Sequence, residues 1–230
     1  MSASVAAAVL LIVLPLAFNG AFAALAATFD YPDILRRPTA EVLARFRAGG
    51  TRLVLLWWGF AMTAVLLAPL AVLVAAALQG ADPTLLAVGA AVGVVAAVVQ
   101  ALGLIRWPFL VPYLARVAGE EHPSAAREEA VDVVFQSFNR YLGVAVGEHL
   151  GYLLTGAWSA LVGAAMTQTS AVPWWLGVIG ILIGAALALC SLEFVGRTGE
   201  DGWKVAAALT PIVYVAWSLW LVASGILLLL

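Results

Sequence analysis

The sequence predicts an all-α, polytopic membrane helix bundle with six transmembrane helices and two amphipathic helices at the inner surface. Of the 230 residues, 64% are hydrophobic and only 10% are charged, and the mean hydropathy is +1.06. In addition, apolar runs near or above the roughly 20 residues that cross a bilayer recur along the chain. The net charge of -2 gives no indication of a nucleic-acid partner, and none is expected.

We expect the whole chain, residues 1–230, to form a single transmembrane domain. The predicted spans cover about residues 4–28, 52–79, 84–106, 141–167, 173–194 and 204–229. The first span could be mistaken for a secretory signal, but no positive charge precedes it, and Arg36 and Arg37 follow it. We therefore interpret it as a retained helix.

The positive charges predict the orientation of these spans. All 11 Lys and Arg residues fall in three connections, within 36–52, 106–140 and 197–204, whereas the connections at 79–83 and 168–171 carry none. Cytoplasmic loops of membrane proteins are enriched in Lys and Arg. The three basic connections are therefore expected in the cytoplasm, and both termini outside.

The first amphipathic helix is expected in the first basic connection. It follows a turn at residues 30–33, its predicted N-cap is Thr39, and Gly49 and Gly50 are suited to its C-terminal end. Its apolar residues share one side, so we expect it to lie in the plane of the lipid headgroups.

The second amphipathic helix is expected in the largest connection, where Pro108 and Pro112 should end the third span and Ser124 should cap the new helix. Its apolar positions follow the i, i+3, i+4, i+7 rule and are Val131, Val134, Phe135 and Phe138. Two interpretations remain open: an element lying on the membrane surface, or a docking face for a partner protein.

Small residues recur every four positions in three spans, a pattern that lets helix backbones approach closely. The longest run consists of Gly143, Gly147, Gly151, Thr155, Ser159, Gly163 and Thr167. Shorter runs contain Gly89 and Gly93 in the third span and Gly180 and Gly184 in the fifth. We expect spans three, four and five to pack through these residues, although such runs would serve a homo-oligomer equally well.

The fourth span also carries the candidate ligand-binding residues. At about 100° per residue around a helix, one polar line fits within roughly 60° and comprises Tyr141, Glu148, Tyr152, Thr155 and Ser159. Glu148 should thus face the bundle interior, where an ionisable group indicates a functional site. His149 is also a candidate ligand-binding residue, but it should point toward a different neighbouring helix than Glu148 does.

Three interpretations of Glu148 remain open. It could be a hydrogen-bonded carboxylate that locks helices together, or part of a pocket for a small or lipidic ligand, with proton coupling as in a transporter. Glu148 and His149 could instead be the acid/base pair of an intramembrane enzyme, but adjacent residues on a helix do not face one site.

Motifs for metal binding and catalysis are missing from the sequence. His122 and His149 are the only histidines, Cys190 is the only cysteine, and no HExxH motif or glycine-rich phosphate loop occurs. We therefore assign no metal site and no catalytic residue, and the sequence leaves any cofactor unknown.

Several segments resemble a known family. They are FDYPDILRRP at 29–38, AEVLARF at 40–46, GEHLGY at 147–152, and Gly202-Trp203 with Pro211 and Trp217-Ser218. Together they resemble a bacterial multi-pass membrane family known as domain of unknown function four-three-eight-six, over nearly the whole chain. The resemblance implies an inner-membrane protein of six or seven helices and brings no activity or catalytic residue with it.

The leading functional hypothesis is a non-enzymatic, integral inner-membrane protein that binds a small or lipidic ligand in a polar intramembrane pocket around Glu148. One alternative is an accessory or regulatory subunit that docks other membrane proteins; another is a transporter or intramembrane enzyme that uses Glu148 and His149. The expected partners are the lipid bilayer, such a ligand, and a second copy of the chain or another membrane protein.

Overall fold

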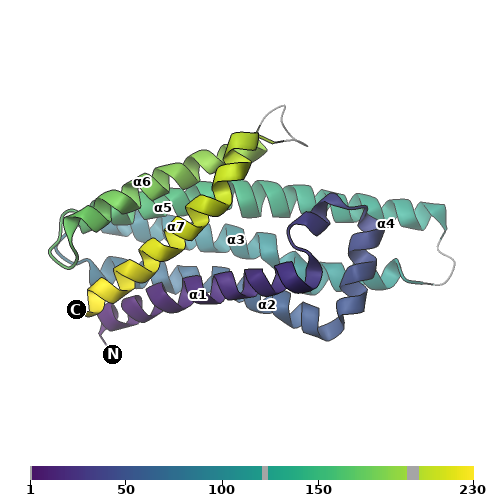
Figure 1. The fold of residues 1–230 in the computed structure, drawn as a ribbon, viewed down its shortest axis with the longest axis horizontal. Helices are drawn as coiled ribbons and strands as arrows, with labels where there is room; N and C mark the ends of the chain where they lie inside the picture. Colours follow the sequence, from purple (N-terminus) through teal and green to yellow (C-terminus); the bar gives the residue numbers. More distant parts are fainter. Residues whose placement is uncertain (1, 121–123, 196–201) are drawn as a thin grey trace.

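The computed structural model describes residues 2–120, 124–195 and 202–230, and the regular elements in these ranges are all helices (Figure 1). Among them, five are long and apolar enough to cross a membrane. They are α1 (Ala3–Phe29), α2 (Thr39–Ala77), α3 (Pro83–Val117), α6 (Trp174–Cys190) with the 3-10 turn η3 (Ser191–Phe194), and α7 (Lys204–Leu229). The predicted all-α class is confirmed, and the five apolar helices indicate a membrane protein.

The segment predicted as the fourth span differs from the expectation. Helix α4 (Ala125–Phe138) is followed without interruption by the π-helix η2 (Asn139–Leu150) and by α5 (Gly151–Met166), and the three lie in line in Figure 1. The second amphipathic helix thus continues the axis of η2 instead of lying apart from it. With only 16 residues, α5 alone is shorter than a typical span. In the described residues, therefore, five helices rather than six are long and apolar enough to cross a membrane.

Helix α2 contains both the first amphipathic segment and a span. The two parts meet at Gly50, whose backbone (φ 54°, ψ -152°) is not helical and suits a glycine. Residues 39–49 run across the bundle in Figure 1. Thr39 is not the N-cap, because Pro38 occupies that position. The Thr39 hydroxyl instead donates to the Asp132 carboxylate.

Helix α3 does not end at its prolines. It contains both Pro108 and Pro112 and continues to Val117. A proline removes one backbone hydrogen bond and can bend a helix without ending it. Trp107 holds this part of the helix in place, since its ring stacks on Trp57 of α2 with centroids 4.3 Å apart.

The two ends of the bundle differ in charge. Both termini lie at one end (Figure 1), which we call the termini end. The two connections without Lys or Arg also meet there, because the Asp82 backbone N–H donates to Gln168 Oε1 at 3.0 Å. The opposite end, which contains the connections rich in arginine, is called the basic end.

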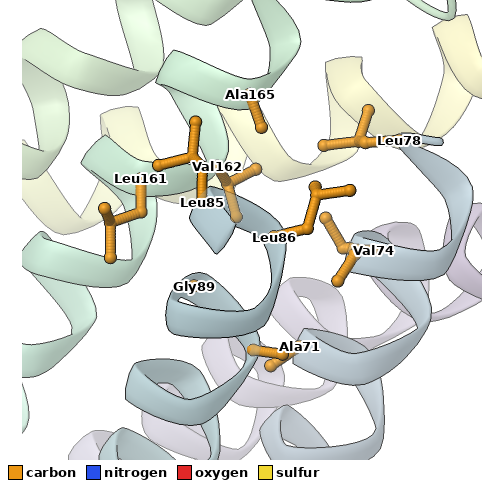
Figure 2. A pocket seen from close by; sticks show the side chains of 11 residues that line it. Ala71, Val74, Leu78, Leu85, Leu86, Gly89, Leu161, Val162 and Ala165 are labelled. Atoms are coloured by element: carbon orange, nitrogen blue, oxygen red, sulfur yellow. The ribbon is translucent and has the colours of Figure 1, made fainter. Parts of the chain in front are cut away.

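Each end has its own hydrophobic core. At the termini end the largest buried side chains include Trp158, Trp217 and Trp220, whereas Phe29, Phe46, Trp57, Trp107 and Phe135 form an aromatic core at the basic end. A small apolar cavity of about 10 Å³ lies between α2, α3 and α5 in the termini half (Figure 2). Because its walls are aliphatic, this cavity offers a water molecule no hydrogen-bond partner.

Candidate functional site

Glu148 lies in η2, toward the basic end of the bundle, and its side chain is half-buried. π-helical segments are rare and occur frequently at functional sites. Three charged or phenolic side chains from other elements are close enough to interact with it electrostatically: Arg106 of α3, Glu193 of η3, and Tyr31 of the turn after α1. Four separate segments therefore contribute polar groups to one region.

Arg106 is buried, and its guanidinium is held by groups other than Glu148. It donates to the Gly103 carbonyl and, at 3.0 Å, to Asn139 Oδ1. Gly143 leaves room for it, because a Cβ at that position would lie 2.5 Å from Arg106 Nη2. The cation is therefore fixed beside η2 by α3 and by the start of the π-helix.

The Glu148 carboxylate itself has no direct partner. Among the described residues, none donates a hydrogen bond to it and none forms an ion pair with it, since the bonds of Arg106 go to Gly103 and Asn139. A carboxylate inside a helix bundle is costly unless its oxygens are paired. Its oxygens are therefore free to accept hydrogen bonds from a bound molecule.

Tyrosine rings form one wall of the region around Glu148. The Tyr152 ring of α5 lies 5.1 Å from that of Tyr214 in α7 and 5.7 Å from Phe194. Both phenols interact electrostatically with Glu148. These aromatic groups give the site apolar faces together with hydroxyl groups that can donate.

Tyr31 supplies a third phenol from outside the spans. Its ring packs edge-on against Trp57, with centroids 5.0 Å apart. Burial, and then the negative charge of Glu148, raise the pKa of Tyr31 above its ordinary value. The phenol therefore stays a neutral O–H donor at physiological pH.

The other predicted site residues are placed differently. Thr155 and Ser159 are fully buried deeper in the bundle, where Thr155 Oγ1 accepts from Gln100 Nε2 at 2.9 Å and Ser159 Oγ accepts from Trp217 Nε1 at 2.8 Å. Tyr141 is 68% exposed. The prediction assumed α-helical rotation, whereas residues 139–150 are π-helical and contain more residues per turn.

His149 has a polar contact of its own. Its Nδ1 lies 2.8 Å from the Ser191 carbonyl oxygen, so it fastens η2 to η3. In the described part of the chain, no three His, Cys, Asp or Glu side chains come together as they would around a metal ion.

The family model described as Domain of unknown function (DUF4386) matches residues 6–225. The chain belongs to this family. The resemblance seen in the FDYPDILRRP and GEHLGY segments is thereby confirmed. No match was found among curated proteins or among solved structures.

Sequence reasoning missed four contributors to the DUF4386 site: Tyr31, Arg106, Glu193 and Tyr214. In the sequence, Arg106 serves as a topology signal and Tyr31 as a turn residue, because both lie in predicted connections. Arg106 lies at the very end of an apolar run, five residues after Ala101 and two before Pro108, and this position gives no indication that its side chain turns inward.

The glycines of η2 bring the site together. Gly147 faces Gly103 so closely that a Cβ on Gly147 would lie 2.9 Å from the Gly103 Cα, and a Cβ on Gly151 would lie 2.9 Å from Gln100 Cγ. The other predicted packing glycines contact as follows: Gly93 faces Ala71 and Trp158, Gly89 faces Leu161, Gly180 faces Trp220, and Gly184 faces Gly156. Close approach of η2 to α3 is what places Glu148 near Arg106.

Proposed function

We propose that the η2–α5 segment is a sixth span and that the protein lies in a bacterial inner membrane with the basic end in the cytoplasm and both termini outside. Three observations support this topology. The 11 Lys and Arg residues lie in alternate connections, and both termini lie at one end (Figure 1). The two connections that contain no Lys or Arg are joined by the Asp82–Gln168 hydrogen bond. Termini on one side require an even number of spans.

Within this membrane domain, the function that the geometry supports best is binding of a small or lipidic ligand at Glu148. The observation that carries this proposal is the half-buried carboxylate without a direct partner, beside a fixed guanidinium and three phenols. Such a carboxylate is satisfied by a ligand that presents a hydroxyl, amide or ammonium donor. The aromatic rings of Tyr152 and Tyr214 would cover the apolar part of that ligand.

Binding is favoured over catalysis because the Nδ1 of the adjacent candidate base, His149, is already in contact with another group. His149 contacts the Ser191 carbonyl rather than Glu148, so no acid/base pair faces a common substrate position. Coupling of the carboxylate to a proton, as in a transporter, remains compatible with the same geometry.

Native mass spectrometry of protein extracted gently from its own membrane tests this proposal. We expect a small molecule or lipid at one copy per chain in the wild type, and a loss of about tenfold or more in Glu148→Gln because the neutral amide removes the charge-assisted bond, typically about 1.5–3 kcal/mol. Tyr141→Phe is the matched control, since Tyr141 also lies in η2 but is exposed. Equal retention in wild type and Glu148→Gln would refute the proposal.

One observation favours a second function, that of an accessory subunit. Helix α4 and the start of η2 leave an apolar face uncovered, formed by Val133, Val134, Phe138 and Tyr141. The same mass spectra distinguish this role. A protein partner that is retained in Glu148→Gln but lost in Phe138→Ser would indicate docking through α4.

A further inference from the structure

A second, separate cavity opens at the basic end, away from Glu148. It has a volume of about 650 Å³ and lies where α2 kinks at Gly50 against the last turns of α3. Its polar lining comprises Arg47, Thr51 and Arg116, and its apolar lining includes Phe46, Val54 and Pro112. Ligand sites commonly have volumes of about 300–1,000 Å³, so the cavity is large enough for a small organic group.

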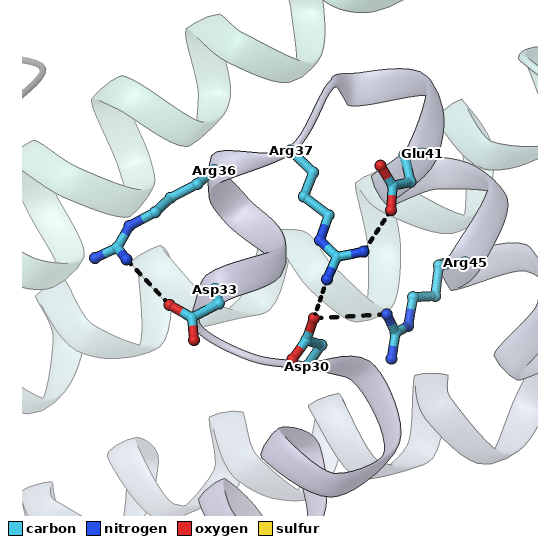
Figure 3. Close-up of polar contacts among 6 residues, drawn as sticks. All are labelled: Asp30, Asp33, Arg36, Arg37, Glu41 and Arg45. Carbon is cyan, nitrogen blue, oxygen red and sulfur yellow. Dashed lines mark hydrogen bonds and ion pairs between the residues drawn. The ribbon is translucent and has the colours of Figure 1, made fainter.

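The arginines of this cavity differ from the nearby arginines in that they form no ion pair with a carboxylate in the described residues. In the neighbouring turn and the start of α2, Arg36 pairs with Asp33, Arg37 pairs with both Asp30 and Glu41, and Arg45 pairs with Asp30 (Figure 3). Arg127 pairs with Glu120. Among the described residues, by contrast, no carboxylate lies within 4 Å of Arg47 or Arg116, and none lines the cavity. The cavity therefore carries two positive charges without an internal counter-ion.

Backbone features hold the cavity open and position Arg47. The non-helical Gly50 turns residues 39–49 away from the direction of the span, and Phe46 of this segment stacks on Trp107 of α3 with centroids 5.9 Å apart. Gly119 faces the Arg47 guanidinium so closely that a Cβ at residue 119 would overlap Nη1. Arg47 Nη1 lies 3.5 Å from the Ala115 carbonyl oxygen, and its remaining N–H groups can bind an anion.

The chemistry of the cavity changes along the bundle axis. Arg47 and Arg116 lie on the side of the basic end. Pro112 lies about one turn further into α3 than Arg116, and Val54 lies beyond the Gly50 kink, in the spanning part of α2. An anion binds best at paired guanidinium groups, and acyl chains pack on apolar side chains. From this arrangement we infer that the cavity binds the headgroup of an anionic phospholipid, with its phosphate between Arg47 and Arg116 and its glycerol toward Val54.

The test is native mass spectrometry of the full chain, delipidated and then titrated with phosphatidylglycerol, phosphatidylcholine or inorganic phosphate. Wild type is expected to retain phosphatidylglycerol preferentially. Arg47→Gln and Arg116→Gln should each weaken retention roughly fivefold, as expected for an arginine at an anionic lipid surface. Gly119→Ala should weaken it without any change in charge, because the new Cβ displaces Arg47.

Arg52→Gln is the matched control, since Arg52 lies beside Thr51 but does not line the cavity. An equal loss in Arg52→Gln would overturn the inference, because unspecific surface charge would then explain the binding. Saturation by inorganic phosphate with the same dependence on Arg47 and Arg116, and no preference for phosphatidylglycerol, would also overturn it. Because the lining residues do not include Glu148, this result is independent of the ligand at Glu148.

Discussion

The termini half and the basic half of the bundle differ in the polar groups they contain. In the termini half and the middle of the bundle, three pairs of neutral polar side chains join helices: Gln100 with Thr155, Trp217 with Ser159, and Asn19 with Ser218. The buried Trp158 Nε1 N–H, by contrast, has no hydrogen-bond partner in the described part of the chain. In the basic half, Glu148, Arg47 and Arg116 lack direct partners of opposite charge among the described residues. Paired groups hold helices together, whereas an accessible charge without a partner of opposite sign can bind a ligand.

The two halves also pack differently. Helices α5 and α6 meet through glycines, and a Cβ on Gly163 would lie 2.5 Å from the Gly177 carbonyl oxygen. The basic half is instead filled by large rings such as those of Trp57 and Trp107. Backbone contact leaves no space between helices, whereas packing through large side chains and a kink at Gly50 leaves cavities at the edges.

The largest expected effect is the loss of backbone contact between α5 and α6. Gly163→Leu should destabilise the protein by about 3 kcal/mol or more, because the new side chain has no space against Gly177 and Ile181. Thermal unfolding in detergent measures this change. Gly20→Leu is the control, since nothing lies within 4 Å of a Cβ at residue 20; similar losses in both variants would contradict the proposed role of the contact.

A smaller effect is expected from one paired polar group. Thr155→Val should lower the free energy of unfolding by about 1 kcal/mol, because it removes the acceptor of the Gln100 side chain while the volume is kept.

In the same unfolding assay, Glu148→Gln should leave the free energy of unfolding unchanged or slightly raised, since the Glu148 carboxylate has no bond to lose. A larger loss in Glu148→Gln than in Thr155→Val would show that Glu148 is a structural residue.

The sequence was sufficient for the elements whose signals are local. Apolar runs predicted the five helices that are long and apolar enough to cross a membrane, and the glycines at 49 and 50 predicted the end of the amphipathic segment. Ser124 caps α4 as predicted, accepting from the Arg127 backbone N–H.

What the sequence could not predict depends on tertiary contacts. The π-helix at 139–150 has no recognised sequence signal here, and it moved Tyr141 away from Glu148. The inward turn of Arg106 requires Gly143 and Asn139 on another element. Pro108 and Pro112 suggested a helix end, but the Trp57–Trp107 stack holds the helix together beyond them.

The most direct test of the central claim is thiol accessibility at two positions of the same helical segment. In a Cys190→Ala background, which removes the only native cysteine, a charged, membrane-impermeant thiol reagent is added to the basic end of oriented vesicles. We expect Glu148→Cys to react roughly tenfold faster or more than Ser159→Cys, because a thiolate forms only in contact with water and Ser159 is 0% exposed. Equal rates, or no reaction at residue 148, would contradict an open polar site at Glu148.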